Sequence, residues 1–134
     1  MKLILTTAAS AALLLAAAPV IVDAQAAPAA PSPDAVKGKA QFARCMACHS
    51  VDAAKPRGIG PNLAGVVGRA AGKQPGFKYT PALAGAKFKW TPDKLNAFLA
   101  KPREVVPGTN MVFAGMSDPV ARKALVAYLG TTAK

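Results

Sequence analysis

Apolar side chains recur at helical spacing in three short stretches of this 134-residue chain, and the two-residue alternation of a β-strand persists nowhere. The first predicted helix covers residues 34–47. The second covers 92–101 behind the N-terminal cap Thr91, and the third begins near 119 and is expected to stop at Gly130. The pattern therefore predicts an all-α fold with three main helices and no sheet.

Glycine and proline dominate the segments between the predicted helices. Residues 50–81 are rich in both, with one helical turn expected at 63–67, and residues 103–115 are again irregular. A domain of about 100 residues has a thin hydrophobic core of its own. We therefore expect the loops to wrap a large apolar ligand.

The N-terminus has the pattern of a secretory signal peptide covering residues 1–24. Lys2 is followed by an uncharged stretch from 3 to 18, and small residues follow it. Cleavage after Ala24 and cleavage after Ala26 both fit this pattern. Export to the periplasm is the expected consequence.

Residues 25–33 form an Ala/Pro-rich linker, and the folded domain is expected at 34–134, with Asp34 capping its first helix. A retained membrane anchor is the alternative to a cleaved signal, because 3–22 is long enough to span a bilayer. In that case the linker would tether the domain to the membrane.

The charge balance is strongly basic, with 17 Lys and Arg residues against six acids and a formal net charge of +11. The basic residues are scattered along the chain, and export argues against a nucleic-acid partner. We expect steering toward the acidic docking face of a protein, with transient contact to a membrane surface also compatible with the charge. Solubility alone is the simpler explanation of the same charge.

The sequence Cys45-Met46-Ala47-Cys48-His49 is the strongest chemical signal in the chain. C-x-x-C-H is the attachment signature of a c-type haem. Two thiols on one turn of helix can add to the two vinyl groups of one porphyrin, and the next residue presents its imidazole to the iron. His49 is the only histidine, so a second histidine ligand is excluded.

Three other uses of these cysteines compete with a haem. A redox dithiol of the thioredoxin kind belongs beside a strand in a βαβ unit, and no such pattern is visible. A structural zinc site normally needs four ligands, whereas the chain offers two cysteines, one histidine and six acids. A structural disulfide remains the third option.

The iron ligand opposite His49 is expected to be a methionine. Met1 belongs to the signal peptide, and Met46 lies between the attachment cysteines, on the histidine side. Met111 follows a Pro-Gly pair in an irregular segment, whereas Met116 stands at the start of the last helix, where methionine more often packs. We favour Met111, with Met116 or an open position as the alternatives.

Ligation by His49 and Met111 would leave no position for peroxide or oxygen, and a neutral thioether favours ferrous iron. Such a site passes electrons and does little else. We therefore expect an electron carrier rather than an enzyme.

The chain resembles class I cytochromes c, the mitochondrial protein and its bacterial periplasmic relatives, over roughly 34–131. Beside the haem motif, the resemblance is carried by segments in the right order: Gly60-Pro61-Asn62-Leu63, Gly68-Arg69, Pro75-Gly76-Phe77-Lys78-Tyr79-Thr80, Trp90, Pro107-Gly108-Thr109-Asn110-Met111 and Leu125-Val126-Ala127-Tyr128-Leu129. It implies a small fold in which long loops wrap one haem, bound covalently through Cys45 and Cys48.

The resemblance also implies roles for individual residues. Pro61 would accept a hydrogen bond from Nδ1 of His49 through its carbonyl. The haem propionates would be neutralised or hydrogen-bonded by Arg69, Tyr79, Trp90 and Thr109.

In the same way, Gly38 and Phe42 of the first helix would pack against Leu125 and Tyr128 of the last one. The glycine would permit the two backbones to approach closely.

Four positions depart from the family pattern. Phe98 stands where a tyrosine usually hydrogen-bonds the methionine sulfur, and Leu83 replaces an asparagine near a buried water. Asn110 stands where a lysine usually precedes the ligand, and Glu104 interrupts the basic cluster beside Arg103. The docking face is therefore expected to be less cationic than the net charge suggests.

Together these patterns predict a soluble, monomeric electron carrier of the periplasm with one haem c. Its partners would be respiratory or photosynthetic complexes, such as a cytochrome bc complex, an oxidase or a reaction centre, or a dehydrogenase. The alternatives are a membrane-tethered carrier and a small ligand-binding or peroxidatic haem protein with a labile sixth ligand.

Overall fold

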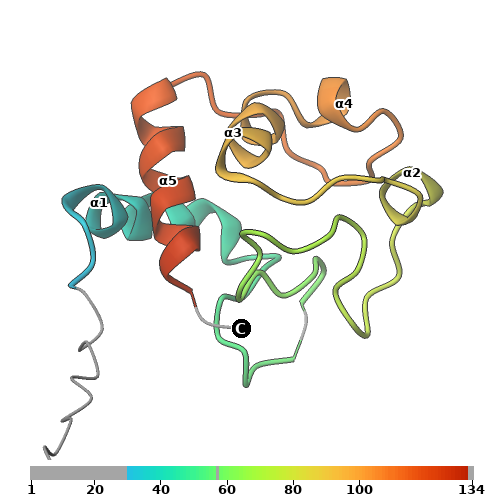
Figure 1. Ribbon diagram of the computed structural model, residues 1–134, viewed down its shortest axis with the longest axis horizontal. Coiled ribbons are helices and arrows are strands. Elements are labelled where there is room, and N and C mark those ends of the chain that lie inside the picture. The colour runs from blue at the N-terminus through green and yellow to red at the C-terminus, as the bar shows by residue number, and fades with distance from the viewer. Residues whose placement is uncertain (1–29, 57, 133–134) are drawn as a thin grey trace, which may run out of the picture.

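The computed structural model describes residues 30–56 and 58–132, and this part of the chain is helical without a single named strand. Three main helices, α1 (Pro33–Phe42), α3 (Pro92–Ala100) and α5 (Pro119–Thr131), surround long loops (Figure 1). An isolated antiparallel bridge joins Ala70 to Lys89. The prediction of an all-α fold is confirmed.

Residues 1–29, which carry the expected signal peptide and most of the expected linker, lie outside the described residues. Within the described ranges, no helix combines the length and the apolar character that crossing a membrane requires.

The first helix is shorter than the sequence pattern predicted, and its cap is a different residue. Ser32 is the N-cap, and its side-chain oxygen accepts a hydrogen bond from the Ala35 amide at 3.2 Å, so the expectation for Asp34 was wrong. Pro33 can occupy the first helical turn because no intrahelical donor is needed there. The α-helix ends at Phe42 and tightens into a 3₁₀ turn, η1 (Ala43–Cys45).

The second main helix agrees with its prediction. Thr91 caps α3 by accepting a hydrogen bond from the Lys94 amide at 3.1 Å, and the helix ends at Ala100, before Pro102. The last helix does not stop at Gly130 but continues through it to Thr131. Gly130 meets no neighbouring atom within 4 Å and does not need a left-handed conformation, so nothing local ends the helix there.

Two single-turn helices were not predicted: α2 (Pro81–Ala84) and α4 (Pro102–Val105). Each begins with a proline, which opens a helical turn without losing a hydrogen bond. Residues 63–67, where a helical turn was expected, form hydrogen-bonded turns instead, with Gly65 at a positive φ of 62°.

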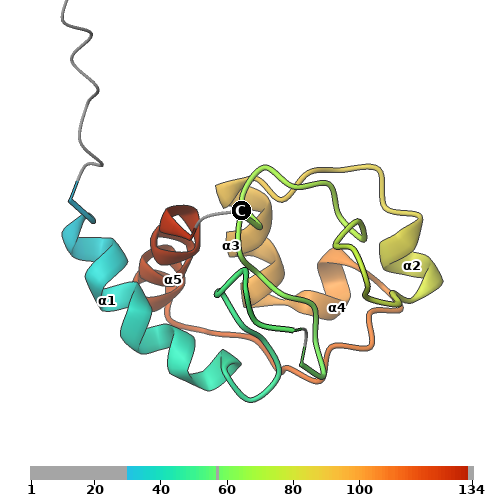
Figure 2. The ribbon, with the colours of Figure 1, turned by 90° about the horizontal axis from the view of Figure 1, so that it is seen from below.

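Helices α1 and α5 lie side by side and cross at Gly38 (Figure 2). A Cβ atom at Gly38 would collide with the carbonyl oxygen of Ala124 and would lie 2.7 Å from Cβ of Tyr128. One turn farther along, the rings of Phe42 and Tyr128 pack with centroids 5.7 Å apart. The absence of a side chain at Gly38 therefore sets the distance between the two helices, as expected from the sequence.

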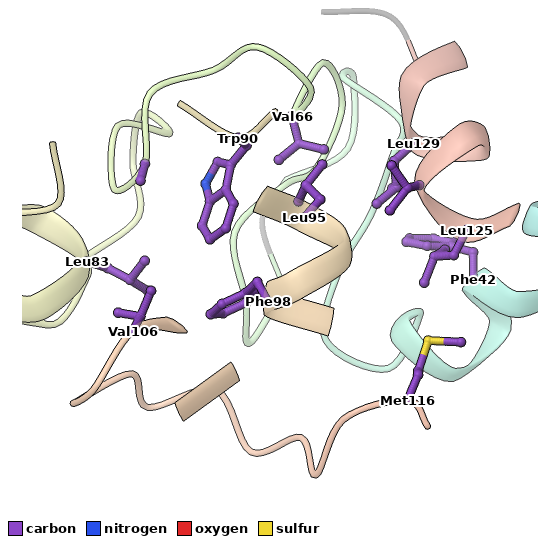
Figure 3. Packing of buried hydrophobic residues seen from close by; sticks show 12 residues of the cluster. Phe42, Val66, Leu83, Trp90, Leu95, Phe98, Val106, Met116, Leu125 and Leu129 are labelled. Atoms are coloured by element: carbon purple, nitrogen blue, oxygen red, sulfur yellow. The ribbon is translucent and has the colours of Figure 1, made fainter. Parts of the chain in front are cut away.

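The hydrophobic core extends from this crossing to the loops on the other side of α3 (Figure 3). Leu125 and Leu129 of α5 lie near Phe42 at one end, and Leu83 of α2 lies at the other with the loop residues Trp90 and Val106. The core side chains come from helices and loops alike, so the loops are held by burial rather than by a backbone ladder.

Candidate haem site

A largely apolar cavity runs through the middle of the fold between the loops and α3. All nine residues that the sequence singled out line this cavity: Cys45, Cys48, His49, Pro61, Arg69, Tyr79, Trp90, Thr109 and Met111. Its remaining walls are mainly aliphatic and aromatic, among them Leu63, Val66, Leu95, Phe98, Phe113 and Leu129. The fold thus gathers residues that are far apart in the sequence around one space.

The two cysteines and the histidine share a turn at the end of η1. The amides of Cys48 and His49 both donate to the carbonyl oxygen of Cys45, at 3.1 and 2.9 Å. Both thiols are free and half-buried. Burial raises the pKa of the Cys45 thiol, an effect that the positive charge of Arg44 opposes.

No group of three or more His, Cys, Asp or Glu side chains that could hold a metal ion occurs within residues 30–56 and 58–132.

The imidazole of His49 is held by the segment Gly60–Pro61. Its Nδ1 atom lies 2.7 Å from the carbonyl oxygen of Pro61. Burial lowers the pKa of His49, and the bond to Pro61 acts in the opposite direction. With Nδ1–H donated to Pro61, the lone pair is on Nε2, which is the arrangement that a metal-binding histidine needs.

Gly60 lies directly against the same ring. A Cβ atom there would be 2.7 Å from Nδ1 and would collide with Cε1. The amide of Gly60 donates to the carbonyl oxygen of Cys48 at 2.8 Å, which ties the loop to the cysteine turn. Only a residue without a side chain permits this close approach.

Of the three methionines in the described residues, one lines the cavity. Met111 does so, whereas Met116 is buried in the hydrophobic core, only 4% exposed, and Met46 is 66% exposed on the surface. Gly108, at a φ of 88°, turns the chain before Met111, and the Thr109 hydroxyl accepts a hydrogen bond from the Met111 amide at 3.3 Å. The thioether, the imidazole and both thiols therefore face one space.

The polar lining is concentrated at Arg69 and its neighbours. The Arg69 guanidinium donates from Nη1 to the Ala64 carbonyl at 3.1 Å and from Nη2 to the Asn62 carbonyl at 2.9 Å. Burial raises the pKa of the Tyr79 hydroxyl, and the nearby charge of Arg69 lowers it. Arg69 thus provides a positive charge, and Tyr79 and Trp90 provide a phenol and an indole N–H. These groups suit the anionic groups of a ligand that is otherwise apolar.

Two residues next to the cavity lining were not singled out from the sequence. Thr80 directly follows Tyr79, and its Oγ1 atom is buried and has no hydrogen-bond partner among the described residues. Asn62 is 6% exposed, and its amide nitrogen donates to the carbonyls of Asp52 and Lys55 at 2.8 and 3.2 Å. Both belong to segments that carried the family resemblance, which was the available signal.

The lining fits a haem. Two thiols stand beside an imidazole, a thioether comes from a distant loop, and the walls are apolar. A haem c requires two thiols for attachment, ligands for its iron and apolar walls for its ring, and this lining offers residues for each.

Two departures from the family pattern also lie in the cavity wall. Phe98 is buried, and its ring packs against Trp90 with centroids 4.9 Å apart, so it brings no hydroxyl to the site. Leu83 is buried beside it and is likewise apolar. The environment of Met111 is therefore drier than a tyrosine and an asparagine would make it.

Comparisons with known proteins agree with this geometry. The sequence profile of the family described as cytochrome c matches residues 35–133. A cytochrome c2 of Agrobacterium tumefaciens is 40% identical over 99 residues, covering 72% of this chain and 89% of the relative. A cytochrome c2 iso-2 of Magnetospirillum fulvum is 48% identical over 88 residues, covering 66% of this chain and 91% of the relative.

Among solved structures, cytochrome cH from Methylobacterium extorquens superposes with a TM-score of 0.70 at 42% identity, covering 74% of this chain and 99% of that one. The profile match, the identities and the C-x-x-C-H spacing lead to the same conclusion. The chain belongs to the cytochrome c family and carries one haem c bound covalently through Cys45 and Cys48.

Proposed function

We propose that this cytochrome is a soluble one-electron carrier whose haem iron is held by His49 and Met111. The observation that carries the proposal is that these two side chains line the same cavity as both attachment cysteines. The bound haem supplies a one-electron ferric/ferrous couple. Closure of both axial positions would leave that couple as the only chemistry available.

The protein's own residues would act by holding the site rigid and dry. Pro61 fixes the orientation of the His49 ring through the bond to Nδ1. The apolar lining excludes water, and a neutral thioether in such a setting stabilises the ferrous state. A rigid site changes little on gaining an electron, which favours rapid transfer.

Electrons would leave where the cavity reaches the surface. Ile59 and Val112 line the cavity and are nevertheless 81% and 95% exposed. Met46, between the attachment cysteines, is exposed as well, and so is Arg44 beside Cys45. Exposed apolar side chains next to a redox centre suit transient docking, so we propose that a redox partner binds at this mouth.

The rest of the surface would guide the encounter. Between 66 and 100 the chain carries six basic residues, Arg69, Lys73, Lys78, Lys87, Lys89 and Lys94, against one acid, Asp93. Such an excess would steer the carrier toward acidic docking faces of the kind expected on a bc complex, an oxidase, a reaction centre or a dehydrogenase. Rates with an acidic partner should fall as salt is raised; a flat salt response would remove the steering role.

Carbon monoxide binding to the reduced protein tests the proposal. A firmly ligated Met111 blocks the sixth position, so no spectral change is expected when carbon monoxide is added at neutral pH. Rapid formation of a carbonyl spectrum would instead show an open or labile site and would favour a ligand-binding or peroxidatic role. Turnover of the reduced protein by membranes with selective inhibitors would then identify the complex that accepts the electron.

For location, we propose export to the periplasm by residues 1–24, with 25–33 as the linker and 34–134 as the haem domain. The support is the sequence pattern of the N-terminus. Fractionation without detergent should release the protein in soluble form. Recovery with the membranes at high salt would instead indicate a tethered carrier.

A further inference from the structure

Arg69 belongs to the lining of two cavities. One is the haem cavity, and the other opens to solvent on the far side of the same loop, where Lys55, Asn62, Gln74 and Gly76 contribute to its wall. Among the residues that the structure describes, Arg69 is the only one that the two linings share. Arg69 therefore borders both cavities.

The guanidinium is held in this dividing position by three oxygens. Two of them are backbone carbonyls, those of Ala64 and Asn62. The third is the side-chain oxygen Oε1 of Gln74, which accepts from Nη1. Within residues 30–56 and 58–132, Gln74 is thus the only side chain that accepts a hydrogen bond from Arg69.

The local backbone places Gln74 at this point. It lies in a tight loop between Gly72, at a φ of 66°, and Gly76, at a φ of 73°. A Cβ atom at Gly72 would collide with the Leu83 carbonyl, so the loop is pressed against α2.

We infer that Gln74 is a positioning residue that keeps the charge of Arg69 on the wall of the haem cavity. The inference rests on the proposed site, in which Arg69 faces the haem. Without the Gln74 oxygen, Nη1 keeps only the Ala64 carbonyl as a partner, so the guanidinium is held less firmly and can move away from the haem cavity toward water, which screens its charge. A nearby positive charge favours ferrous over ferric iron, so screening that charge should lower the reduction potential.

The first variant for a test is Gln74→Met, which keeps the length and packing of the side chain and removes its oxygen. Gln41→Met makes the same chemical change on α1, on a helix that does not contact Arg69, and is the matched control. Both are prepared as haem-loaded protein. At a fixed ambient potential, we expect the ferrous-to-ferric ratio of Gln74→Met to fall by about threefold relative to wild type, and that of the control to stay unchanged.

The second readout is the rotation of the Arg69 guanidinium about its Nε–Cζ bond, measured by NMR of ¹⁵N-labelled arginine. Rotation should be slow in the wild type and in Gln41→Met and clearly faster in Gln74→Met. Gln74→Glu, which retains an acceptor, should rotate as slowly as the wild type. A residue that only stabilised the loop would change the melting temperature and leave this rotation alone.

The outcomes separate the inference from the proposed site. Slow rotation in Gln74→Met, or fast rotation already in the wild type, overturns the positioning role. Faster rotation with an unchanged ferrous-to-ferric ratio overturns the haem-facing role of Arg69, and the inference with it. If Gln74→Met does not fold, Gln74→Ala, which also removes the oxygen, replaces it in both measurements, and slow rotation in that variant overturns the positioning role.

Discussion

The carbonyl oxygen of Pro61 lies 2.7 Å from Nδ1 of His49, and Gly60 brings the backbone flat against the same ring. The hydrogen bond assigns the proton to Nδ1 and leaves Nε2 for the iron. The partner is a backbone carbonyl, so it depends on the path of the loop and not on the identity of a side chain. The backbone thus sets the orientation of the imidazole that we propose as an iron ligand.

Gly60→Ala should therefore damage the site more than Pro61→Ala. The added Cβ would collide with the His49 ring, and overpacking of this kind costs about 1–3 kcal/mol. Pro61→Ala keeps the carbonyl and should cost less. Unfolding of the haem-loaded variants in guanidinium chloride measures both; equal losses would show that the proline ring, not the glycine, governs the approach.

Met111→Ala should abolish the weak sulfur-to-iron band in the far red and open the reduced protein to carbon monoxide. Met116→Leu is the control, because Met116 packs in the hydrophobic core and does not line the cavity. That variant should retain the band. Survival of the band in Met111→Ala would assign the ligand to another residue.

Two glycines in helices should respond to alanine in opposite directions. Gly38→Ala places a methyl group in contact with Ala124 and Tyr128 and should destabilise the α1–α5 crossing by about 1–3 kcal/mol. Gly130→Ala adds a methyl group in open space within α5 and should stabilise the protein by about 0.4–1 kcal/mol. Thermal unfolding of the two variants checks the signs, and a loss at both positions would contradict the placement of Gly130 in a helix.

The Tyr79 hydroxyl should ionise at higher pH than an ordinary tyrosine, because burial raises its pKa more than Arg69 lowers it. The chain has two tyrosines, so Tyr128→Phe leaves Tyr79 as the only one. NMR of its ¹³Cζ atom should give a midpoint above about 10. A midpoint at or below that value would mean that Arg69 outweighs burial.

The direction of this pKa shift also has a consequence for stability. The folded-state pKa is raised, so the contribution of Tyr79 is full below the unfolded-state pKa of about 10 and is lost as pH rises through the folded value. Tyr79→Phe should unfold with a shallower loss of stability above pH 10. An unchanged slope would show that the hydroxyl is equally solvated in both states.

The sequence by itself determined the features that depend on neighbours within a few residues. The cap of α3 uses Thr91 and Lys94, three positions apart, and is visible as Thr-Pro-Asp. The two cysteines and His49 share one turn, so the C-x-x-C-H motif alone predicts a covalently bound haem. Gly38 could be placed at a helix crossing because the family resemblance supplied the partner helix.

Tertiary structure alone decided what depends on distant segments meeting. Thr80 can be recognised as an unpaired hydroxyl only once the surrounding chain has buried it, and Gln74 only once its loop has brought it to Arg69. The end of the last helix was misjudged at Gly130 for the same reason, because packing against α1 and α3 sustains α5 past a residue that often stops helices. Local helix propensity contributes less free energy than the burial of side chains in the complete fold. These features could therefore be recognised only in the folded structure.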